Sequence, residues 1–236
     1  MNNQFSKKDR VLVIASHPDD DILGCGGTLA YLRSIKIKVK VLFLAEGVSA
    51  RFNKDELLSK KFIKASKIRH DSALKALKII DVNEYEFQDR LCTRFDEIPL
   101  LDLVKAIEKV IYDFKPTIIF THNDSEVNID HVITHNAVEV AARPNIKSVL
   151  HSIYLFEIPC SGNFKFVKNF NPNVYVDIEK FRRKKYKAWS CFEHETRPYP
   201  FPRSVDALDA IAKYRGLQSG IKYAEGFFLA RQKIIV

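Results

Sequence analysis

The chain has 236 residues, of which 46% are hydrophobic and 28% charged. That is enough to bury one substantial core, in one large domain or two small ones. No long uncharged apolar run is present, so we expect no membrane span, and the polar start, MNNQFSKKDR, does not resemble a secretory signal. The four cysteines are scattered without a CxxC pair, which predicts a reduced, cytoplasmic protein without disulfides or a thiolate zinc site.

The formal net charge is +9. Such a balance suits either a solvated basic surface or an anionic partner, whether nucleic acid, a membrane surface or a phosphorylated substrate. Basic residues are densest at 59–69 and in RRKK at 182–185. Because neither stretch has a nucleic-acid motif or an aromatic–basic repeat, we expect simple solvation or a small anionic ligand, and no nucleic-acid partner.

Strand and helix patterns alternate along the chain. Apolar runs predict strands at VLVIAS (11–16), KVKVLFLA (38–45), YEFQ (85–88), TIIFTH (117–122), SIYLFEIP (152–159) and NVYVDI (173–178). Helical spacing predicts helices at 22–34, 55–79, 99–114, 131–143 and 181–193, followed by a C-terminal helix that packs back on the domain.

Strands separated by helices require right-handed crossovers and a mostly parallel sheet. The sequence has no internal repeat, no low-complexity tract and no clear linker. PYPFPRS at 198–204 is rich in proline but short enough to be a surface loop that fixes a turn. We therefore predict a single α/β domain over residues 1–236, with a Rossmann-like, mostly parallel sheet flanked by helices.

Two polar clusters stand directly after predicted strands. HPDDD, residues 17–21, follows the first strand, and NDSEVNIDH, residues 123–131, follows the strand at 117–122. Ligands of open α/β sheets bind outside the carboxyl ends of the strands, so the fold can bring the two clusters side by side. Three adjacent carboxylates next to apolar residues also need a compensating positive charge. Both arguments place a functional site here.

A catalytic zinc ion takes three imidazole or carboxylate ligands and leaves one position open for water. His17 and Asp20 lie three residues apart on a turn, and His131, just past the second cluster, is the best third ligand. Asp19 then stays free beside the bound water as a base, while Asp21 caps and packs the next helix. The alternative is a tight turn with a capping acid and no metal, which the second cluster disfavours. Iron or cobalt would suit the same ligands.

Other motifs carry less weight. His135 lies one helical turn from His131, but the glutamate of an HExxH motif is missing, so we expect His135 on the surface or behind the ligands. His122 ends a strand and either lines the pocket or is structural. The GCGG run at 24–27 misses the GxGxxG spacing of a dinucleotide site, so its glycines are expected to let a helix approach the sheet closely. No GxSxG motif supports a serine hydrolase.

These residues resemble a known family. ASHPDDDILGCGGTLA, residues 15–30, is similar to the signature of the PIG-L/LmbE family of zinc-dependent N-acetylglucosaminyl deacetylases, AHPDDE followed by GCGGTLA. The resemblance continues along most of the chain, through AEGVSAR (45–51), THNDSEVNIDH (121–131), FEIPCSG (156–162), FRRKKYKAWSCFEHETRPYPFPRS (181–204) and YRGLQSGIKYAEGFFLAR (214–231). The last three segments look like a bacterial branch tied to glycan and antibiotic assembly.

The resemblance implies an LmbE-like fold in which zinc is held by His17, Asp20 and His131. It implies that Asp19 is the general base and that Asp130 orients a ligand or tunes that base. Arg51 would contact the sugar or its phosphate-bearing part, and Arg203 is a further candidate for the same pocket.

The sequence departs from the family pattern in three places. Asp21 stands where glutamate is usual, and Phe201 stands where relatives often have histidine. Asn128 stands where many relatives have a histidine that stabilises the oxyanion. An asparagine amide donates a hydrogen bond but no proton, so we expect Asp19, after taking the water's proton, to return it to the leaving amine.

The expected activity is metal-assisted removal of an N-acetyl group from an amino sugar in glycan or secondary-metabolite biosynthesis, with a nucleotide or lipid carrier left open. One alternative is a zinc amidohydrolase of a non-sugar N-acyl metabolite. Another is an inactive protein that keeps the fold and binds a sugar nucleotide. The apolar segment YAEGFF, residues 223–228, either lies in a homo-oligomer interface or packs internally.

Overall fold

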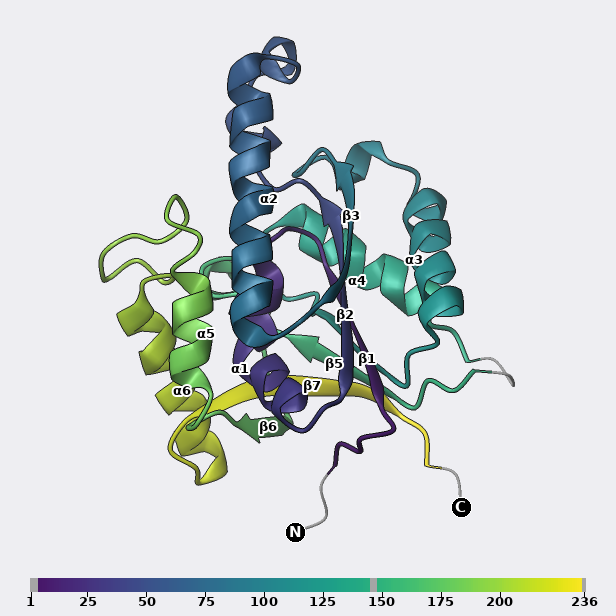
Figure 1. Ribbon diagram of the computed structural model, residues 1–236, viewed down its shortest axis with the longest axis vertical. Helices are drawn as coiled ribbons and strands as arrows, with labels where there is room; N and C mark the ends of the chain where they lie inside the picture. The colour runs from purple at the N-terminus through teal and green to yellow at the C-terminus, as the bar shows by residue number, and fades with distance from the viewer. Residues whose placement is uncertain (1–3, 145–147, 235–236) are drawn as a thin grey trace.

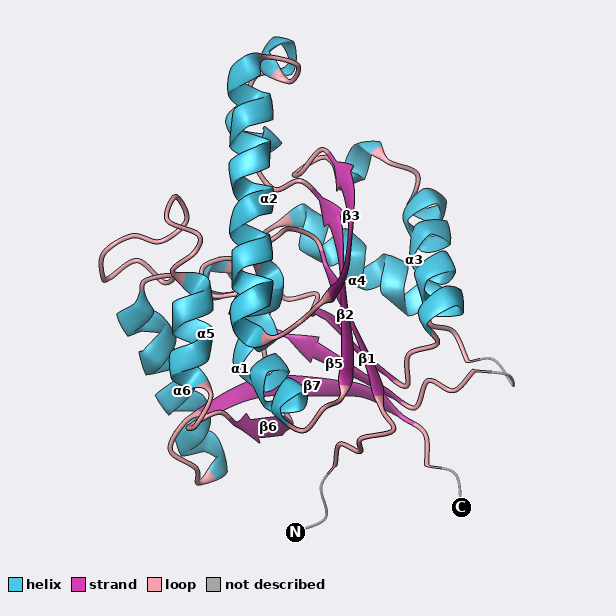
Figure 2. Ribbon diagram, in the orientation of Figure 1, coloured by secondary structure: helices cyan, strands magenta, loops and turns pink. Residues whose placement is uncertain are grey.

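The computed structural model describes residues 4–144 and 148–234, which form one sheet covered by helices on both faces (Figures 1 and 2). In the described residues the sheet has seven strands in the order β3-β2-β1-β4-β5-β7-β6. The strands are β1 (Arg10–Ala15), β2 (Lys38–Ala45), β3 (Glu84–Arg90), β4 (Ile118–His122), β5 (Ser152–Phe156), β6 (Val174–Asp177) and β7 (Ala224–Gln232). The helices are α1 (Asp20–Ser34), α2 (Lys60–Ile80), α3 (Leu100–Phe114), α4 (Ile129–Ala141), α5 (Arg182–Trp189) and α6 (Val205–Ser219).

Strands β3, β2, β1, β4 and β5 run parallel, and β7 runs antiparallel to both β5 and β6. The predicted α/β class and the mostly parallel sheet are therefore confirmed. The central strands β1 and β4 are almost wholly buried, which explains their continuous apolar sequences, because both faces of such a strand are covered. No helix in the described ranges is long and apolar enough to cross a membrane.

Two hydrophobic cores lie on opposite faces of the sheet. One packs α1, α2 and α5 against one face around Phe43, Phe120 and Trp189. The other packs α3 and α4 against the opposite face around Leu12 and Phe95. The strands that carry the two polar clusters, β1 and β4, are neighbours in the middle of this sandwich, so both clusters leave the sheet at the same edge.

The end of the chain differs from the prediction. A helix, α6, does pack near the C-terminus, but the described chain ends in the strand β7, which the sequence analysis did not predict. Segment 223–228 contributes to β7, where Phe227 is buried against the ring of Phe120, 5.1 Å away between centroids. The internal packing of this segment is therefore the correct alternative for Phe227, while Phe228 is part-exposed. The polar residues of AEGFFLARQ interrupt the apolar pattern from which a strand is predicted. One of these residues is buried because it forms an ion pair within the protein.

That residue is Glu225, which ties β7 to α1. Helix α1 departs from helical geometry at Cys25, with φ −145° and ψ 16°, and this break exposes amide groups that begin its second half. The carboxylate of Glu225 accepts hydrogen bonds from the N–H groups of Gly27 (2.9 Å) and Thr28 (2.7 Å). Lys185 Nζ lies 2.7 Å from the same carboxylate, so β7, α5 and α1 meet at one buried ion pair.

Close approach of α1 to its neighbours explains the glycine run. A Cβ atom on Gly24 would lie 2.4 Å from the ring of Phe156, and one on Gly27 would lie 2.8 Å from Ile178. Real side chains do not tolerate such distances in a packed interior. The glycines therefore serve helix–sheet contact, as the sequence analysis expected.

The substitution Glu225→Gln should lower the free energy of unfolding by about 3 kcal/mol, because it leaves Lys185 buried without its counter-charge. Urea denaturation measures this loss. The exposed Glu139→Gln on α4 is the control and should change stability by less than about 0.5 kcal/mol. The double variant with Lys185→Met should recover part of the loss, and wild-type stability of Glu225→Gln would contradict the assignment.

Candidate metal centre

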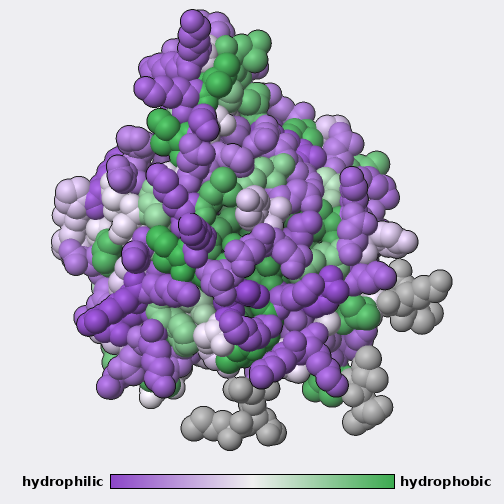
Figure 3. All heavy atoms as spheres, in the orientation of Figure 1, coloured by the Kyte–Doolittle hydropathy of each residue, from purple (hydrophilic) through white to green (hydrophobic). Residues whose placement is uncertain are grey.

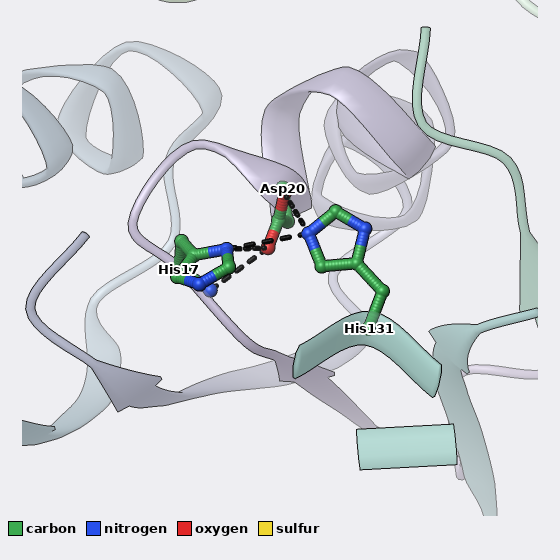
Figure 4. Close-up of side chains that lie close together, drawn as sticks. All are labelled: His17, Asp20 and His131. Atoms are coloured by element: carbon green, nitrogen blue, oxygen red, sulfur yellow. Dashed lines mark hydrogen bonds and ion pairs between the residues drawn. The ribbon is translucent and has the colours of Figure 1, made fainter. Parts of the chain in front are cut away.

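The two polar clusters meet at the carboxyl ends of β1 and β4, as the topology argument predicted. His17 follows β1, Asp20 begins α1, and His131 lies in the first turn of α4. One potential ligand atom from each residue lies within 4.8 Å of the others, and all three side chains are buried (Figure 4). The structure thus brings together the three residues that the sequence analysis selected, from positions more than one hundred residues apart.

The orientation of His17 is set by Asp130. His17 Nε2 lies 2.9 Å from Asp130 Oδ2, so this nitrogen carries the proton and Nδ1 faces the cluster, 3.3 Å from Asp20 Oδ2. Asp130 is itself held by backbone N–H groups of Thr93 and Phe95. A carboxylate behind an imidazole in this way fixes the tautomer that ligates a metal.

His131 is oriented in the same manner by Glu126. The Nδ1 atom of His131 lies 3.2 Å from Glu126 Oε2, which leaves Nε2 directed at Asp20 Oδ1, 3.5 Å away. Glu126 is fully buried and also accepts hydrogen bonds from Asn123 and from the N–H of Ile158. Sequence reasoning missed Glu126, although it stood inside the second polar cluster.

The contacts of the Asp20 carboxylate indicate whether a cation fits between the three side chains. Its Oδ2 accepts a hydrogen bond from the N–H of His17 at 2.8 Å, but its buried Oδ1 has no hydrogen-bond partner among the described residues. Burial of this carboxyl opposes ionisation, yet the imidazoles of His131 and His122 hold its pKa well below the usual range. A buried anionic oxygen with the Nε2 atom of His131 3.5 Å away suits a divalent cation, and the two-histidine, one-carboxylate set matches known zinc ligands.

The protonation of the imidazoles agrees with this fit. Burial lowers the pKa of His131 and of His122 to about 4, so both rings are neutral near pH 7, the form that binds metals. Burial also opposes the charge on His17, but its hydrogen bonds to Asp130 and Asp20 raise its pKa well above the usual value. Metal binding at His17 would therefore displace a proton.

His122 and His135 lie behind the three ligands. The ring of His122 stacks on that of His131 with 4.1 Å between centroids, and its Nε2 accepts a hydrogen bond from the N–H of Ser16 at 3.0 Å. His122 is fully buried, its Nδ1 has no hydrogen-bond partner among the described residues, and its Nε2 lies 3.4 Å from Asp20 Oδ2, so both alternatives for this residue stay open. His135 Nδ1 lies 3.0 Å from the carbonyl oxygen of His122, which agrees with the position behind the ligands expected for it.

Asp19 faces arginines rather than the helix that follows it. Its side chain makes no capping hydrogen bond to α1; instead Oδ2 accepts one from Arg69 Nη1 at 2.8 Å, and Arg203 Nη1 lies 3.5 Å away. Burial raises the pKa of the Asp19 carboxyl, and the charge of Arg69 acts against that rise. Arg69 was missed because it stands in a lysine-rich helix, where one more cation predicts only a solvated face.

The carboxylate of Glu195 lies close to three arginine side chains near Asp19. Arg51 and Arg69 both donate to Glu195 Oε1, and Arg203 Nη1 lies 3.9 Å from Oε2. Arg51, Arg69 and Glu195 line a cleft of about 400 Å³ whose walls include Phe52. Arg203 thus lies beside Asp19, whereas Arg51 is separated from Asp19 by the Glu195 carboxylate, and substrate contact by either arginine stays a prediction. Sequence reasoning gave no signal for Glu195.

The expectation that Asp21 caps the helix is wrong. Asp21 does not cap a helix: it is the second residue of α1, is buried, and neither of its carboxylate oxygens has a hydrogen-bond partner in the described chain. Burial raises its pKa to about 8, so the group is mostly protonated at neutral pH.

Asn128 is the N-cap of α4, and its Oδ1 accepts a hydrogen bond from the N–H of Asp130 at 3.0 Å. Its amide nitrogen remains able to donate, and its oxyanion role stays a prediction.

Known proteins of similar sequence are deacetylases. The protein named uncharacterized deacetylase YaiS, from Escherichia coli K12, is 28% identical over 180 residues, which cover 74% of this chain and 85% of that protein. The diacetylchitobiose deacetylase of Thermococcus kodakarensis is 27% identical over 244 residues, which cover 96% of this chain and 85% of that enzyme.

Solved structures share the fold. The N,N'-diacetylchitobiose deacetylase of Pyrococcus horikoshii, in complex with its inhibitor MPG, superposes with a TM-score of 0.74 at 22% identity, over 94% of this chain and 84% of that one. The 4-carboxy-2-hydroxymuconate hydratase GalB of Pseudomonas putida superposes with a TM-score of 0.71 at 21% identity, over 96% of this chain and 98% of that one. At these identities the likeness shows the fold alone, and the hydratase shows that this fold carries more than one chemistry.

A match to a family model shows the family to which this chain belongs. The model of the family described as PIG-L, GlcNAc-PI de-N-acetylase, matches residues 12–142, just over half of the chain and the part that contains both polar clusters. This chain therefore belongs to the PIG-L family of de-N-acetylases.

Proposed function

We propose that this protein is a metal-dependent deacetylase that removes the N-acetyl group from an amino sugar. The observation that carries the proposal is the arrangement of three ligand atoms within 4.8 Å beside an additional carboxylate, Asp19, in the same turn. Family membership and the diacetylchitobiose deacetylases among the relatives support deacetylation of a sugar.

We assign the metal to His17, Asp20 and His131, with zinc as the first choice and iron or cobalt as alternatives. When bound, a divalent cation at these residues polarises the amide carbonyl and lowers the pKa of a water molecule. Asp130 and Glu126 contribute by keeping the two imidazoles in the ligating tautomer.

Proton transfer falls to Asp19. It accepts the proton of the attacking water as the C–O bond forms and the carbonyl carbon becomes tetrahedral. It then returns that proton to the nitrogen as the C–N bond breaks, which releases the free amine and acetate. Arg69 and Arg203 hold the carboxylate in position for both steps. Asn128 donates from its amide nitrogen to the oxyanion, and it needs no proton of its own for that task.

The substrate is an N-acetylated amino sugar on a larger carrier. The cleft of about 400 Å³ that begins at Arg69 is large enough for one sugar unit and its attachment, and the half-exposed Arg51 at its wall suits a phosphate. A nucleotide or a lipid carrier would both supply that phosphate, in the assembly of a glycan or secondary metabolite. The free cysteines agree with a cytoplasmic site of action.

Two other functions compete with this proposal. An amidohydrolase of a non-sugar N-acyl metabolite would use the same residues, and a panel of N-acetylated sugars and N-acyl amines separates the two by relative kcat/KM. An inactive sugar-nucleotide-binding protein would have no need for a buried carboxylate oxygen without a partner, and the one on Asp20 argues against it.

The variant Asp19→Asn should keep its metal and lose deacetylation by at least about a hundredfold in kcat, because the proton acceptor is gone. Metal content by mass spectrometry and turnover on the best sugar of the panel are measured on the same sample. The matched control is the neighbouring Asp21→Asn, a conservative change at a mostly protonated carboxyl, which should retain activity. Unchanged turnover in Asp19→Asn would remove it from the role of base.

The variant Asp130→Asn should weaken metal affinity by about ten- to a hundredfold, because the amide holds the imidazole of His17 less firmly in the ligating tautomer. Competition with a chromogenic chelator measures the affinity without any substrate. Asp124→Asn, at a part-exposed carboxyl that pairs with Lys168, is the control and should bind metal as the wild type does. Equal affinities in all three proteins would separate Asp130 from the metal centre.

A further inference from the structure

The N-terminal end of α2 projects beyond the rest of the molecule (Figure 1). We call residues 51–68 the α2 tip. Figure 3 shows hydrophobic and hydrophilic side chains next to each other on this projection. Leu58 is 91% exposed and Ile63 is 59% exposed, although apolar side chains of this size are usually covered in a monomer.

The α2 tip is strongly basic. It contains six cationic and two acidic side chains in eighteen residues, a net charge of +4; the cations are Arg51, Lys54, Lys60, Lys61, Lys64 and Lys67. From the sequence alone, this density suits simple solvation or a small anionic ligand. Solvation accounts for the lysines but not for the apolar side chains that stand among them.

Capping hydrogen bonds and ring packing fix the local structure of the α2 tip. Ser59 caps α2 by accepting the N–H of Phe62 at 3.1 Å, and Asn53 and Glu56 cap the preceding turn reciprocally. The rings of Phe52 and Phe62 pack edge to face with 5.5 Å between centroids. Leu58 is therefore presented on a structured turn rather than on a loose loop, which lowers the entropy cost of inserting it into a partner.

A second exposed apolar segment leaves the same edge of the sheet. The loop after β5 carries Phe166, which is fully exposed, and Val167, which is 91% exposed, between Lys165 and Lys168. The chain between β2 and β3 carries the α2 tip, and β2 and β5 are both parallel to the central strands. Both segments therefore begin at the carboxyl edge, where the metal centre lies.

We propose that this edge docks on an anionic lipid surface through the α2 tip and the loop 164–168. Exposed leucine, isoleucine, phenylalanine and valine side chains enter the boundary of the acyl chains, while the surrounding lysines pair with anionic headgroups. Duplex nucleic acid would use the lysines and leave Leu58 and Phe166 in water. The proposal does not depend on the enzymatic reaction, because it concerns only where the protein binds.

Co-sedimentation with vesicles tests the proposal on the full chain. We expect binding to vesicles of equimolar phosphatidylcholine and phosphatidylglycerol, weaker binding at high salt, and little binding to phosphatidylcholine alone. The triple variant Lys60→Gln, Lys61→Gln, Lys64→Gln should bind roughly a hundredfold more weakly, at about fivefold for each lysine. The double variant Leu58→Ser, Phe166→Ser should lose at least about tenfold through lost apolar insertion.

Matched controls come from the opposite edge of the sheet. Lys36, Lys78 and Lys115 are exposed and stand just before β2, β3 and β4, so their triple change to Gln removes the same charge from the far edge and should leave binding intact. Leu217→Ser, at an 81% exposed position on α6, is the apolar control. Thermal unfolding should be the same in all variants, because every changed side chain is at the surface.

Four results would overturn the proposal. They are no binding of the wild type to anionic vesicles, equal losses in the tip and control variants, self-association that the tip variants abolish in analytical ultracentrifugation, and duplex DNA binding that depends on the same tip residues without vesicle binding. The third result would assign the surface to a second copy of the chain, and the fourth to nucleic acid. None of them bears on the deacetylase assignment, which is tested by turnover and metal content.

Discussion

The main physical constraint on this structure is one buried carboxylate oxygen, Oδ1 of Asp20, which has no hydrogen-bond partner among the described residues. Asp20 Oδ1 lies beside the neutral imidazole of His131, whereas His17, whose pKa is raised, faces the other oxygen, Oδ2. A buried anionic oxygen without a donor is costly unless a positive charge joins it. The surrounding residues prepare for that charge: Asp130 and Glu126 each turn one imidazole so that its free nitrogen faces Asp20. The parallel pairing of β1 with β4 is what brings these groups together, so the sheet order and the site share one cause.

Local patterns were enough to predict most of the sheet and the three proposed ligands. A buried apolar run that ends in HPDDD marks the carboxyl end of a strand, and the rule for ligands of parallel sheets then joins it to the cluster that ends at His131. Arg69 and Glu195 have no such signal, because each acts through a partner distant in sequence. Glu126 stood inside the second polar cluster, five residues before His131, and was missed for lack of any sign that it would lie behind that ring. The prediction for Asp21 was wrong because the helix, expected from residue 22, begins two residues earlier at Asp20, which places Asp21 in its buried first turn and not at the cap.

The final strand shows the same limit. β7 runs antiparallel at the far side of the sheet, and its one buried charge, Glu225, interrupts the apolar pattern that identifies a strand. That charge has meaning only together with Lys185 and the broken middle of α1. Fold alone also leaves the reaction open, since a hydratase shares this architecture.

The hydrogen bonds between Glu225 and the interrupted helix connect segments that lie far apart in the sequence. The helix whose first residue is Asp20 receives its second set of backbone partners from a strand synthesised some two hundred residues later. Full backbone bonding of the helix that begins with Asp20 therefore depends on a strand that is distant in the sequence, and this helix is complete only when β7 has docked.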